Sequence, residues 1–331
     1  MKRMIFLWST TCLSLLLFTS CKDDEAKKNP DIYVAGYFRV MAKGTHTIAS
    51  YWKNGIATEL TNGAGNARAY GIAVSGTDVY VVGEETLTQR IFKYWKNGEA
   101  TDLTDGSIAA EAYSVFVDEG DVYVAGYEGN VARYWKNGAP VDLTDGDHEA
   151  EVTCIAVNGS DVYAAGHEHN GSVYVAKYWK NGSPTPLTNG AADAQAISIF
   201  IFNGDIYVAG MDGDVLTYWK NGMPFELTDG TLNASASSLT VSGGDVYVSG
   251  FESDGAVEIA KYWKNGTAVP LTDGSHDATA TSIRVAGKDV YVTGTEYVEG
   301  RSIAKYWKNG QEFILNEDET TGYVYDMALV E

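Results

Sequence analysis

The chain has 331 residues, and its 24 Lys and Arg against 44 Asp and Glu give a formal net charge of −20. Charge of this sign repels nucleic acid and anionic lipid headgroups, which excludes nucleic acid as a partner. The three cysteines include Cys12 and Cys21 near the N-terminus, so no intramolecular disulfide framework is available to the rest of the chain.

The first twenty residues are typical of a signal peptide. Lys2 and Arg3 precede an apolar stretch that ends at Phe18, and this stretch is too short for a membrane span. The run Phe18-Thr19-Ser20-Cys21 resembles the lipobox of bacterial lipoproteins, with Phe18 where that family usually has Leu. This resemblance implies that Cys21 is acylated and that the acyl chains anchor the protein in a membrane.

Residues 21–30 are expected to form a flexible tether, because residues 22–30 are charged and have no hydrophobic periodicity. The segment resembles the spacer of outer-membrane lipoproteins. Its Lys followed by an acidic run resembles an export signal of some Gram-negative lipoproteins. The resemblance implies an outer-membrane lipoprotein of a Gram-negative bacterium, on either the cell surface or the periplasmic face.

A repeated motif organises the rest of the chain. Tyr-Trp-Lys-Asn-Gly occurs seven times at spacings of 40–44 residues, which is the period of a four-stranded propeller blade. Asn-Gly predicts a tight hairpin turn, since both residues tolerate the positive φ of a type I′ turn. The copies begin at Tyr51, Tyr94, Tyr134, Tyr178, Tyr218, Tyr262 and Tyr306.

Four strand patterns, a to d in chain order, recur around this motif. Strand a has a small third residue, strand c carries Tyr-Trp-Lys, and strand d ends in Leu-Thr. Adjacent Tyr and Trp point to opposite faces of strand c, so each is expected to pack against a different neighbouring blade. Strand b runs from an Asp to a Gly, and these Asp residues are expected to fix turns: Asp31, Asp78, Asp121, Asp161, Asp205, Asp245 and Asp289.

The two ends of the repeat predict a closed ring. No strand a precedes Asp31, whereas residues 324–329 fit the strand a pattern and no strand b follows them. We therefore predict an all-β fold over residues 31–331, a seven-bladed β-propeller with four antiparallel strands per blade. The C-terminal strand completes the first blade and removes the free edge. The protein is expected to be a monomer.

Residues 31–331 resemble the repeat-built β-propellers of bacterial extracytoplasmic lipoproteins, through the recurring Val-Tyr-Val-Ala-Gly and Tyr-Trp-Lys-Asn-Gly segments. They depart from the WD-repeat family, because Trp-Lys stands where Trp-Asp would and no Gly-His pair precedes the blade. A fold resemblance of this kind carries no activity with it.

Binding is expected where the repeats differ. Between the Gly of strand b and the Tyr of strand c there are 7–14 residues, so the b–c loops are interpreted as the variable binding surface. The a–b and c–d turns are uniform and make the opposite face. The candidate ligand-binding residues in the b–c loops are Glu84, Glu85, His167, Glu168, His169, Glu252, Asp254 and Glu296.

The loop residues leave other chemistry open. The loop carboxylates would suit glycoside chemistry, but their spacing selects no pair. His167 and His169 share a strand face and would chelate zinc or copper, yet no third ligand is visible, and the alternative is a solvated hairpin. No nucleophile, phosphate-binding or dinucleotide motif occurs, so no cofactor and no metal are predicted.

Two residues stand out inside the strands. Cys154 is expected to be a small buried residue. Arg284 breaks the strand a pattern and is either a channel-facing anchor or a paired surface charge, of which we favour the second. The sequence as a whole predicts a lipid-anchored, non-enzymatic binding or scaffold propeller that presents its b–c loop face to a glycan or protein partner. The alternative is a hydrolase or lyase that acts on polysaccharide through loop carboxylates.

Overall fold

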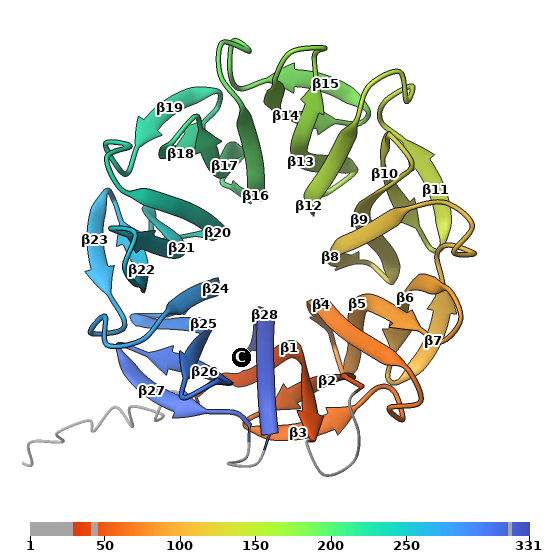
Figure 1. Ribbon diagram of the computed structural model, residues 1–331. Helices are drawn as coiled ribbons and strands as arrows, with labels where there is room; N and C mark the ends of the chain where they lie inside the picture. The colour runs from red at the N-terminus through yellow and green to blue at the C-terminus, as the bar shows by residue number, and fades with distance from the viewer. Residues whose placement is uncertain (1–28, 41–45, 317–319) are drawn as a thin grey trace, which may run out of the picture.

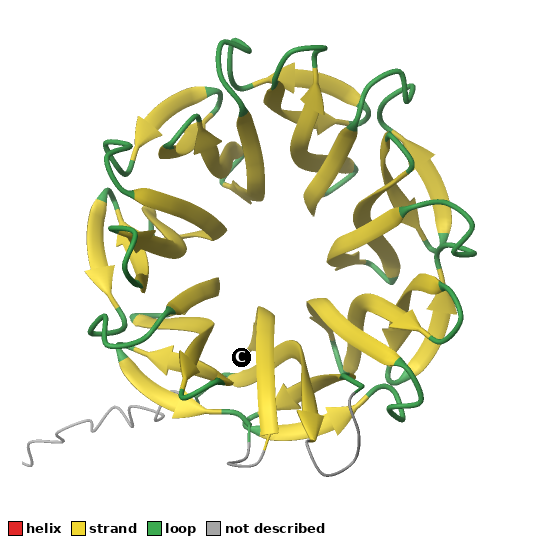
Figure 2. Ribbon diagram, in the orientation of Figure 1, coloured by secondary structure: helices red, strands yellow, loops and turns green. Residues whose placement is uncertain are grey.

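A computed structural model describes residues 29–40, 46–316 and 320–331, so the predicted signal peptide and Cys21 lie outside the described residues. These residues form seven four-stranded antiparallel sheets arranged as blades around a central channel (Figure 1). Strands and their connections make up the whole ring in Figure 2. No helix long and apolar enough to cross a membrane occurs in the described ranges. The predicted seven-bladed propeller is confirmed.

The strands alternate in direction from the channel to the rim of each blade. The inner strands are β28 (Thr320–Val330), β4 (Asn66–Ser75), β8 (Ala110–Asp118), β12 (Ala150–Asn158), β16 (Ala194–Phe202), β20 (Asn233–Ser242) and β24 (Ala278–Ala286). The second strands are β1 (Asp31–Val40), β5 (Asp78–Thr86), β9 (Asp121–Glu128), β13 (Asp161–His169), β17 (Asp205–Asp212), β21 (Asp245–Ser253) and β25 (Asp289–Val298). The third strands are β2 (Ile48–Lys53), β6 (Arg90–Lys96), β10 (Val131–Lys136), β14 (Tyr174–Lys180), β18 (Val215–Lys220), β22 (Glu258–Lys264) and β26 (Arg301–Lys308). The outer strands are β3 (Ile56–Glu59), β7 (Glu99–Asp102), β11 (Ala139–Asp142), β15 (Ser183–Pro186), β19 (Met223–Glu226), β23 (Thr267–Pro270) and β27 (Gln311–Ile314).

The last strand of the chain closes the ring, as predicted. β28 pairs antiparallel with β1, from Asp31 opposite Val330 to Val40 opposite Thr320, and the sheet order of blade 1 is β28-β1-β2-β3. Figure 1 shows the two ends of the ring lying side by side in this blade. Because the first blade takes its inner strand from the C-terminus, neither end of the ring leaves an inner strand unpaired.

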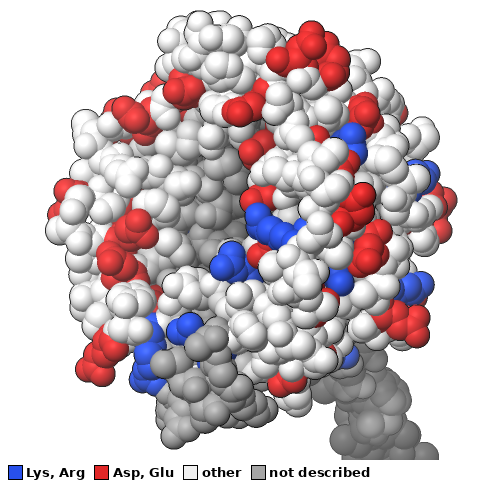
Figure 3. Space-filling model, turned by 45° about the vertical axis from the view of Figure 1, so that its right-hand side comes forward, with Lys and Arg blue, Asp and Glu red and all other residues white. Residues whose placement is uncertain are grey.

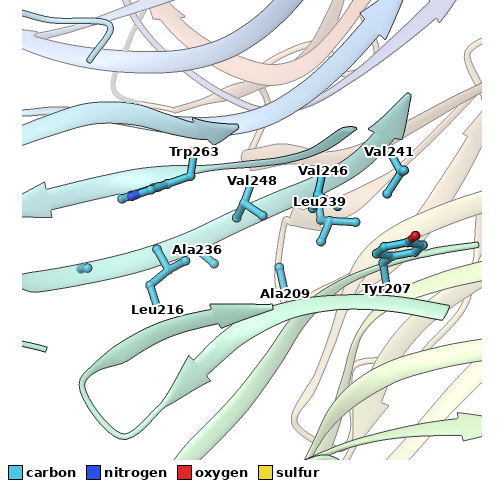
Figure 4. Close-up of a cluster of buried hydrophobic side chains, with 10 residues drawn as sticks. Tyr207, Ala209, Leu216, Ala236, Leu239, Val241, Val246, Val248 and Trp263 are labelled. Atoms are coloured by element: carbon cyan, nitrogen blue, oxygen red, sulfur yellow. The ribbon is translucent and has the colours of Figure 1, made fainter. Parts of the chain in front are cut away.

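The motif Trp and Tyr residues hold neighbouring blades together. Trp263 of blade 6 is 1% exposed and packs in one cluster with Leu216 and Tyr207 of blade 5 (Figure 4). The adjacent Tyr262 points the other way and packs against the cluster that contains Trp307 of blade 7. The expectation that each aromatic residue packs against a different neighbouring blade is therefore confirmed, and all seven motif Trp residues are buried.

The face that carries the a–b and c–d turns is built from one repeated network. In blade 3, Asn137 and Gly138 have φ of 51° and 82°, as a type I′ turn requires. The Asn137 side chain accepts a hydrogen bond from Val122 N and donates one to Asp121, each at 2.8 Å. Lys136 pairs with the other oxygen of Asp121 at 2.7 Å. Equivalent Asn–Asp bonds occur in all seven blades, so the repeated Asp residues fix turns.

On the opposite face, the predicted extent of the b–c loops is wrong. Most residues counted as b–c loops continue the two strands, because backbone pairing persists beyond the strand b Gly: Glu84 lies opposite Arg68 in β4 and opposite Phe92 in β6. The count from Gly to Tyr therefore measured mostly strand. Among the described residues the complete connections are 87–89, 129–130, 170–173, 213–214, 254–257 and 299–300.

Candidate functional site: an aromatic and charged arc at the channel mouth

Each inner strand carries a β-bulge near the face that holds the b–c connections. In β4 the pairing register shifts between Ala69 and Gly71, which leaves Tyr70 as the extra residue. A bulge bends its strand and re-aims the extra side chain, and here those side chains line the central cavity of about 650 Å³. The seven equivalent residues, from blade 1 to blade 7, are Tyr325, Tyr70, Tyr113, Thr153, Ile197, Ser237 and Thr281.

Three consecutive blades place tyrosine at this position, and further tyrosines join them. The Tyr70 and Tyr325 rings meet edge to face with centroids 5.2 Å apart, and Tyr37 stacks on Tyr323 at 5.2 Å. Tyr113 lies beside Tyr127 at 6.4 Å. We call this set, Tyr37, Tyr70, Tyr113, Tyr127, Tyr323 and Tyr325, the tyrosine arc. It lies on blades 1 to 3, whereas blades 4 to 7 have small or aliphatic residues at the bulge.

Glu84 is the centre of a charged network beside the arc. Its side chain is buried, accepts a hydrogen bond from the Tyr70 hydroxyl at 2.9 Å, and pairs with Arg90. Arg68 lies 3.7 Å from the same carboxylate and above the Tyr37 ring. Arg90 also reaches Glu111 of blade 3 at 3.2 Å. Figure 3 shows basic and acidic side chains gathered along one side of the central hollow.

We call the end of the channel where the bulges lie the mouth. Its blade 4 side is acidic. The Tyr113 hydroxyl donates to Glu151 Oε2 at 3.2 Å, and His167 Nε2 lies 4.0 Å from the same oxygen. His167 is 5% exposed and meets the Tyr174 ring edge to face at 4.9 Å. The Tyr174 hydroxyl donates to Glu149 at 2.7 Å. The network therefore continues from blade 3 into blade 4.

Burial sets the protonation states at the mouth. It raises the pKa of Tyr70 and of Tyr127 to about 12, and it also raises the pKa of Tyr113. Burial lowers the pKa of His167 to about 4 and raises the pKa of the Glu151 carboxyl. Near neutral pH the arc therefore offers protonated hydroxyls and aromatic faces, and His167 is a neutral imidazole.

Two of the predicted site residues, Glu84 and His167, lie at this mouth. Their neighbours Glu85 and Glu168 point to the opposite face of the sheet, because successive residues of a strand alternate. Glu85 pairs with Lys93 at 3.0 Å, and Glu168 pairs with Lys177. Three other blades repeat this intra-blade pair of a second-strand carboxylate with a third-strand cation, as Glu128–Arg133, Glu252–Lys261 and Glu296–Lys305.

The remaining candidates lie where the second strand of a blade ends, and His169 borders the mouth through Tyr174. His169 Nδ1 accepts a hydrogen bond from Gly171 N at 3.1 Å, and its ring meets Tyr174 at 5.1 Å. Asp254 accepts one from Ala256 N at 3.0 Å and so closes the connection after β21. Among the described residues, no group of three or more His, Cys, Asp or Glu side chains is placed to hold a metal ion.

Arg284 and Cys154 line the channel. Arg284 is a channel-facing anchor, so the favoured interpretation as a paired surface charge is wrong: it meets Asp326 of blade 1 at 3.0 Å and Ser238 of blade 6 at 3.2 Å. Cys154 is half-buried, not fully buried, because the small third residue of the strand a pattern faces the channel. Burial raises the pKa of the Cys154 thiol, which keeps it protonated.

Sequence reasoning missed the tyrosine arc, both arginines, and Glu111 and Glu151. The signal was present in the repeat itself, since the second residue of the strand a pattern is Tyr in three blades and Thr, Ile or Ser in the other four. A position-by-position comparison of the blades identifies this position, whereas a search for motifs along the chain does not.

Comparisons with known proteins show the fold. No family model matches the chain. No curated protein matches it either. Among solved structures, a puromycin-hydrolyzing peptidase of Mycobacterium tuberculosis is 13% identical, with a TM-score of 0.57, over 88% of this chain and 53% of the peptidase. A structure from a study of two prolyl endopeptidases is 12% identical, with a TM-score of 0.51, over 89% and 50%. The chain thus spans about half the length of these two solved structures.

Proposed function

We propose that this protein is a lipid-anchored, non-enzymatic binding propeller that holds a glycan at the tyrosine arc. The observation that carries the proposal is the asymmetry of the mouth: structurally equivalent bulge positions hold Tyr325, Tyr70 and Tyr113 in blades 1 to 3, but no aromatic residue in blades 4 to 7. Blade packing does not explain a residue that only three blades have. Tyrosine suits a sugar ligand, because its ring covers apolar C–H faces while its hydroxyl bonds to sugar hydroxyls.

The shape and polarity of the mouth favour a glycan over a protein partner. Three tyrosines of the arc, Tyr70, Tyr113 and Tyr325, line a concave cavity of about 650 Å³, whereas a stable protein interface covers roughly 800 Å² on each partner. Glu84, Arg68 and Arg90 add fixed donors and acceptors beside the rings. Ring faces together with polar groups match the alternating apolar and hydroxyl surfaces of a saccharide chain.

The anchor is the second part of the proposal. The run Phe18-Thr19-Ser20-Cys21 and the charged tether support acylation at Cys21 and attachment to the outer membrane. Acyl chains supply membrane affinity that an acidic propeller lacks. The tether would then hold the ring away from the membrane, with the mouth open to glycans of the cell envelope or its surroundings.

The test is a glycan-array screen of the fragment 29–331, which contains every strand and every core cluster of the ring. Glycans that bind the wild type should bind the Tyr70→Ser and Tyr113→Ser variants on the order of tenfold more weakly, a loss of about 1.4 kcal/mol. Tyr297→Ser is the matched control, because Tyr297 is an exposed tyrosine of β25 outside the arc. Unchanged binding by both arc variants would overturn the proposal.

A second candidate function is polysaccharide cleavage. The Tyr113 hydroxyl is bonded to Glu151 while Glu111 lies on the same inner strand, and burial raises the Glu151 pKa in the direction that a general acid requires. An enzyme would shorten the glycan that it binds, and Glu151→Gln would abolish this turnover. Size analysis of a bound oligosaccharide after prolonged incubation separates the two functions, since a binding protein returns it intact.

A further inference from the structure

Basic side chains neutralise the charge of only some carboxylates at the mouth. Glu84 has two guanidinium partners, Arg68 and Arg90, and Glu111 shares Arg90. Glu149 and Glu151 instead accept hydrogen bonds from neutral hydroxyls, those of Tyr174 at 2.7 Å and Tyr113 at 3.2 Å. No lysine or arginine within the described ranges pairs with either carboxylate. The blade 3–4 side of the mouth therefore carries two negative charges without a basic counterpart.

His167 does not supply the missing positive charge. It is 5% exposed, its Nε2 points at Glu151 from 4.0 Å, and its Nδ1 is buried without a hydrogen-bond partner among the described residues. Burial lowers its pKa to about 4, so the ring is neutral at physiological pH. Burial of the imidazole with this unpaired Nδ1 is costly, and at 4.0 Å its Nε2 makes no hydrogen bond to Glu151. A group bound beside Glu151 would complete the arrangement on the Nε2 side of the ring.

Aromatic rings border the same two carboxylates. Tyr113 and Tyr127 lie on the blade 3 side, and Tyr174 lies on the blade 4 side. The Tyr113 hydroxyl donates to Glu151 and the Tyr174 hydroxyl donates to Glu149, so each of the two carboxylates lies against an aromatic residue. Carboxylates next to tyrosine faces attract a cation in two ways, by direct charge pairing and by cation–π interaction.

The cation that fits is an ammonium group rather than a metal ion. The acidic side chains are not arranged to hold a metal anywhere in the described residues. An ammonium has three N–H donors, and carboxylate and hydroxyl oxygens accept them without a metal's fixed short distances. It also needs no dedicated ligand cage, and Glu149 is exposed, so the group is accessible from the mouth.

We propose that Glu149, Glu151 and the surrounding tyrosines of blades 3 and 4 form a subsite for the primary ammonium group of a de-N-acetylated amino sugar. The inference rests on the proposed function and adds a substrate class to it. The tyrosine arc then takes the neighbouring sugar rings, and the acidic subsite selects the residue with a free amine. Glycans whose hexosamines are N-acetylated lack the charge and lose this selection.

The experiment compares two hexamers of β-1,4-linked glucosamine, one fully de-N-acetylated and one fully N-acetylated, by calorimetry on the fragment 29–331. The wild type should prefer the free-amine hexamer at least tenfold, and added salt should weaken that preference. Glu149→Gln and Glu151→Gln should each reduce the preference to roughly threefold or less. Glu168→Gln is the control, since its carboxylate lies on the same blade but pairs with Lys177 on the other sheet face.

The outcomes distinguish failure of the ammonium subsite from failure of glycan binding. Equal binding of the two hexamers overturns the ammonium subsite and leaves glycan binding intact. Loss of preference in Glu168→Gln as large as in Glu151→Gln also overturns it, because general acidity would then explain the result. If neither hexamer binds, the inference fails, and the array decides separately whether any glycan binds. Tighter binding of a lysine peptide of equal charge would assign the acidic site to a protein partner instead.

Discussion

Substitutions of two aromatic residues in blade 3 should separate effects on folding from effects on binding most clearly. Trp135 is 1% exposed and packs between blades 2 and 3, in a cluster with Phe92 and Val115. Tyr113 occupies the bulge position of the same blade and lines the channel. We predict that Trp135→Ala lowers stability and that Tyr113→Ser lowers binding, with little effect of each substitution on the other property.

The magnitudes follow from burial and from the repeat. Replacing a buried Trp by Ala costs about 3–5 kcal/mol, since it removes packing and leaves a cavity. An unfolding entropy of about 2.1 cal/mol/K per residue over roughly 300 residues converts this cost into a fall of about 5–8 °C in Tm. Tyr113→Ser should cost only about 1 kcal/mol, because blades 4, 6 and 7 already place Thr or Ser at the bulge.

The assay is paired: calorimetric melting and titration of an array-identified glycan for each variant of the fragment 29–331. We expect the Trp135→Ala fragment, once folded, to bind the glycan with nearly wild-type affinity. If Trp135→Ala melted within 1 °C of the wild type and lost only its glycan binding, the motif tryptophans would be ligand platforms. The assignment of these residues to blade packing would then have to be abandoned.

Three further predictions test closure, burial and anchoring. Deleting residues 323–331 removes most of β28 and exposes the edge of β1, so the fragment should become insoluble or melt at least 10 °C lower; an unchanged Tm would contradict ring closure. The pKa of His167 is about 4 in the folded protein against an ordinary 6.5. Its burial as a neutral ring therefore contributes stability that is complete above pH 6.5 and is lost as the pH falls from 6.5 to 4. Between pH 7 and pH 4, the free energy of unfolding in urea should fall about 3 kcal/mol more for the wild type than for His167→Gln. Equal falls would refute the burial of His167 as a neutral group. Metabolic labelling with a fatty acid should mark the wild type and not Cys21→Ala, and labelled Cys21→Ala protein would refute the lipid anchor.

The architecture could be predicted because each blade repeats the same local rules. Asn-Gly demands positive φ at two residues, adjacent Tyr and Trp must face opposite sides of one strand, and the unpaired pattern at 324–329 needs a partner near Asp31. These constraints act over a few residues or follow from counting strands. They therefore predicted the turns, the blade interfaces and the closure that the structure has.

The site could be predicted only in part, because it depends on geometry that a single repeat does not reveal. Glu84 was identified as a candidate, but its neighbour Glu85 was identified equally, and only the strand alternation places one at the mouth and the other in an ion pair. Tyr70 owes its direction to a bulge, which appears in the pairing register and not in the apolar pattern. Burial of His167 likewise comes from packing between β12, β13 and β14, so its neutral state could not be inferred from the residues beside it in the sequence.

The most direct measurement of the central claim is hydrogen–deuterium exchange of the fragment 29–331 with and without a glycan that binds it. The account predicts slower exchange in peptides that cover residues 66–71, 110–114, 150–153 and 321–326, which form the mouth on blades 1 to 4. Exchange at the Asn-Gly turns of the opposite face should not change. Protection confined to those turns or to the outer strands, with the mouth unaffected, would contradict the account.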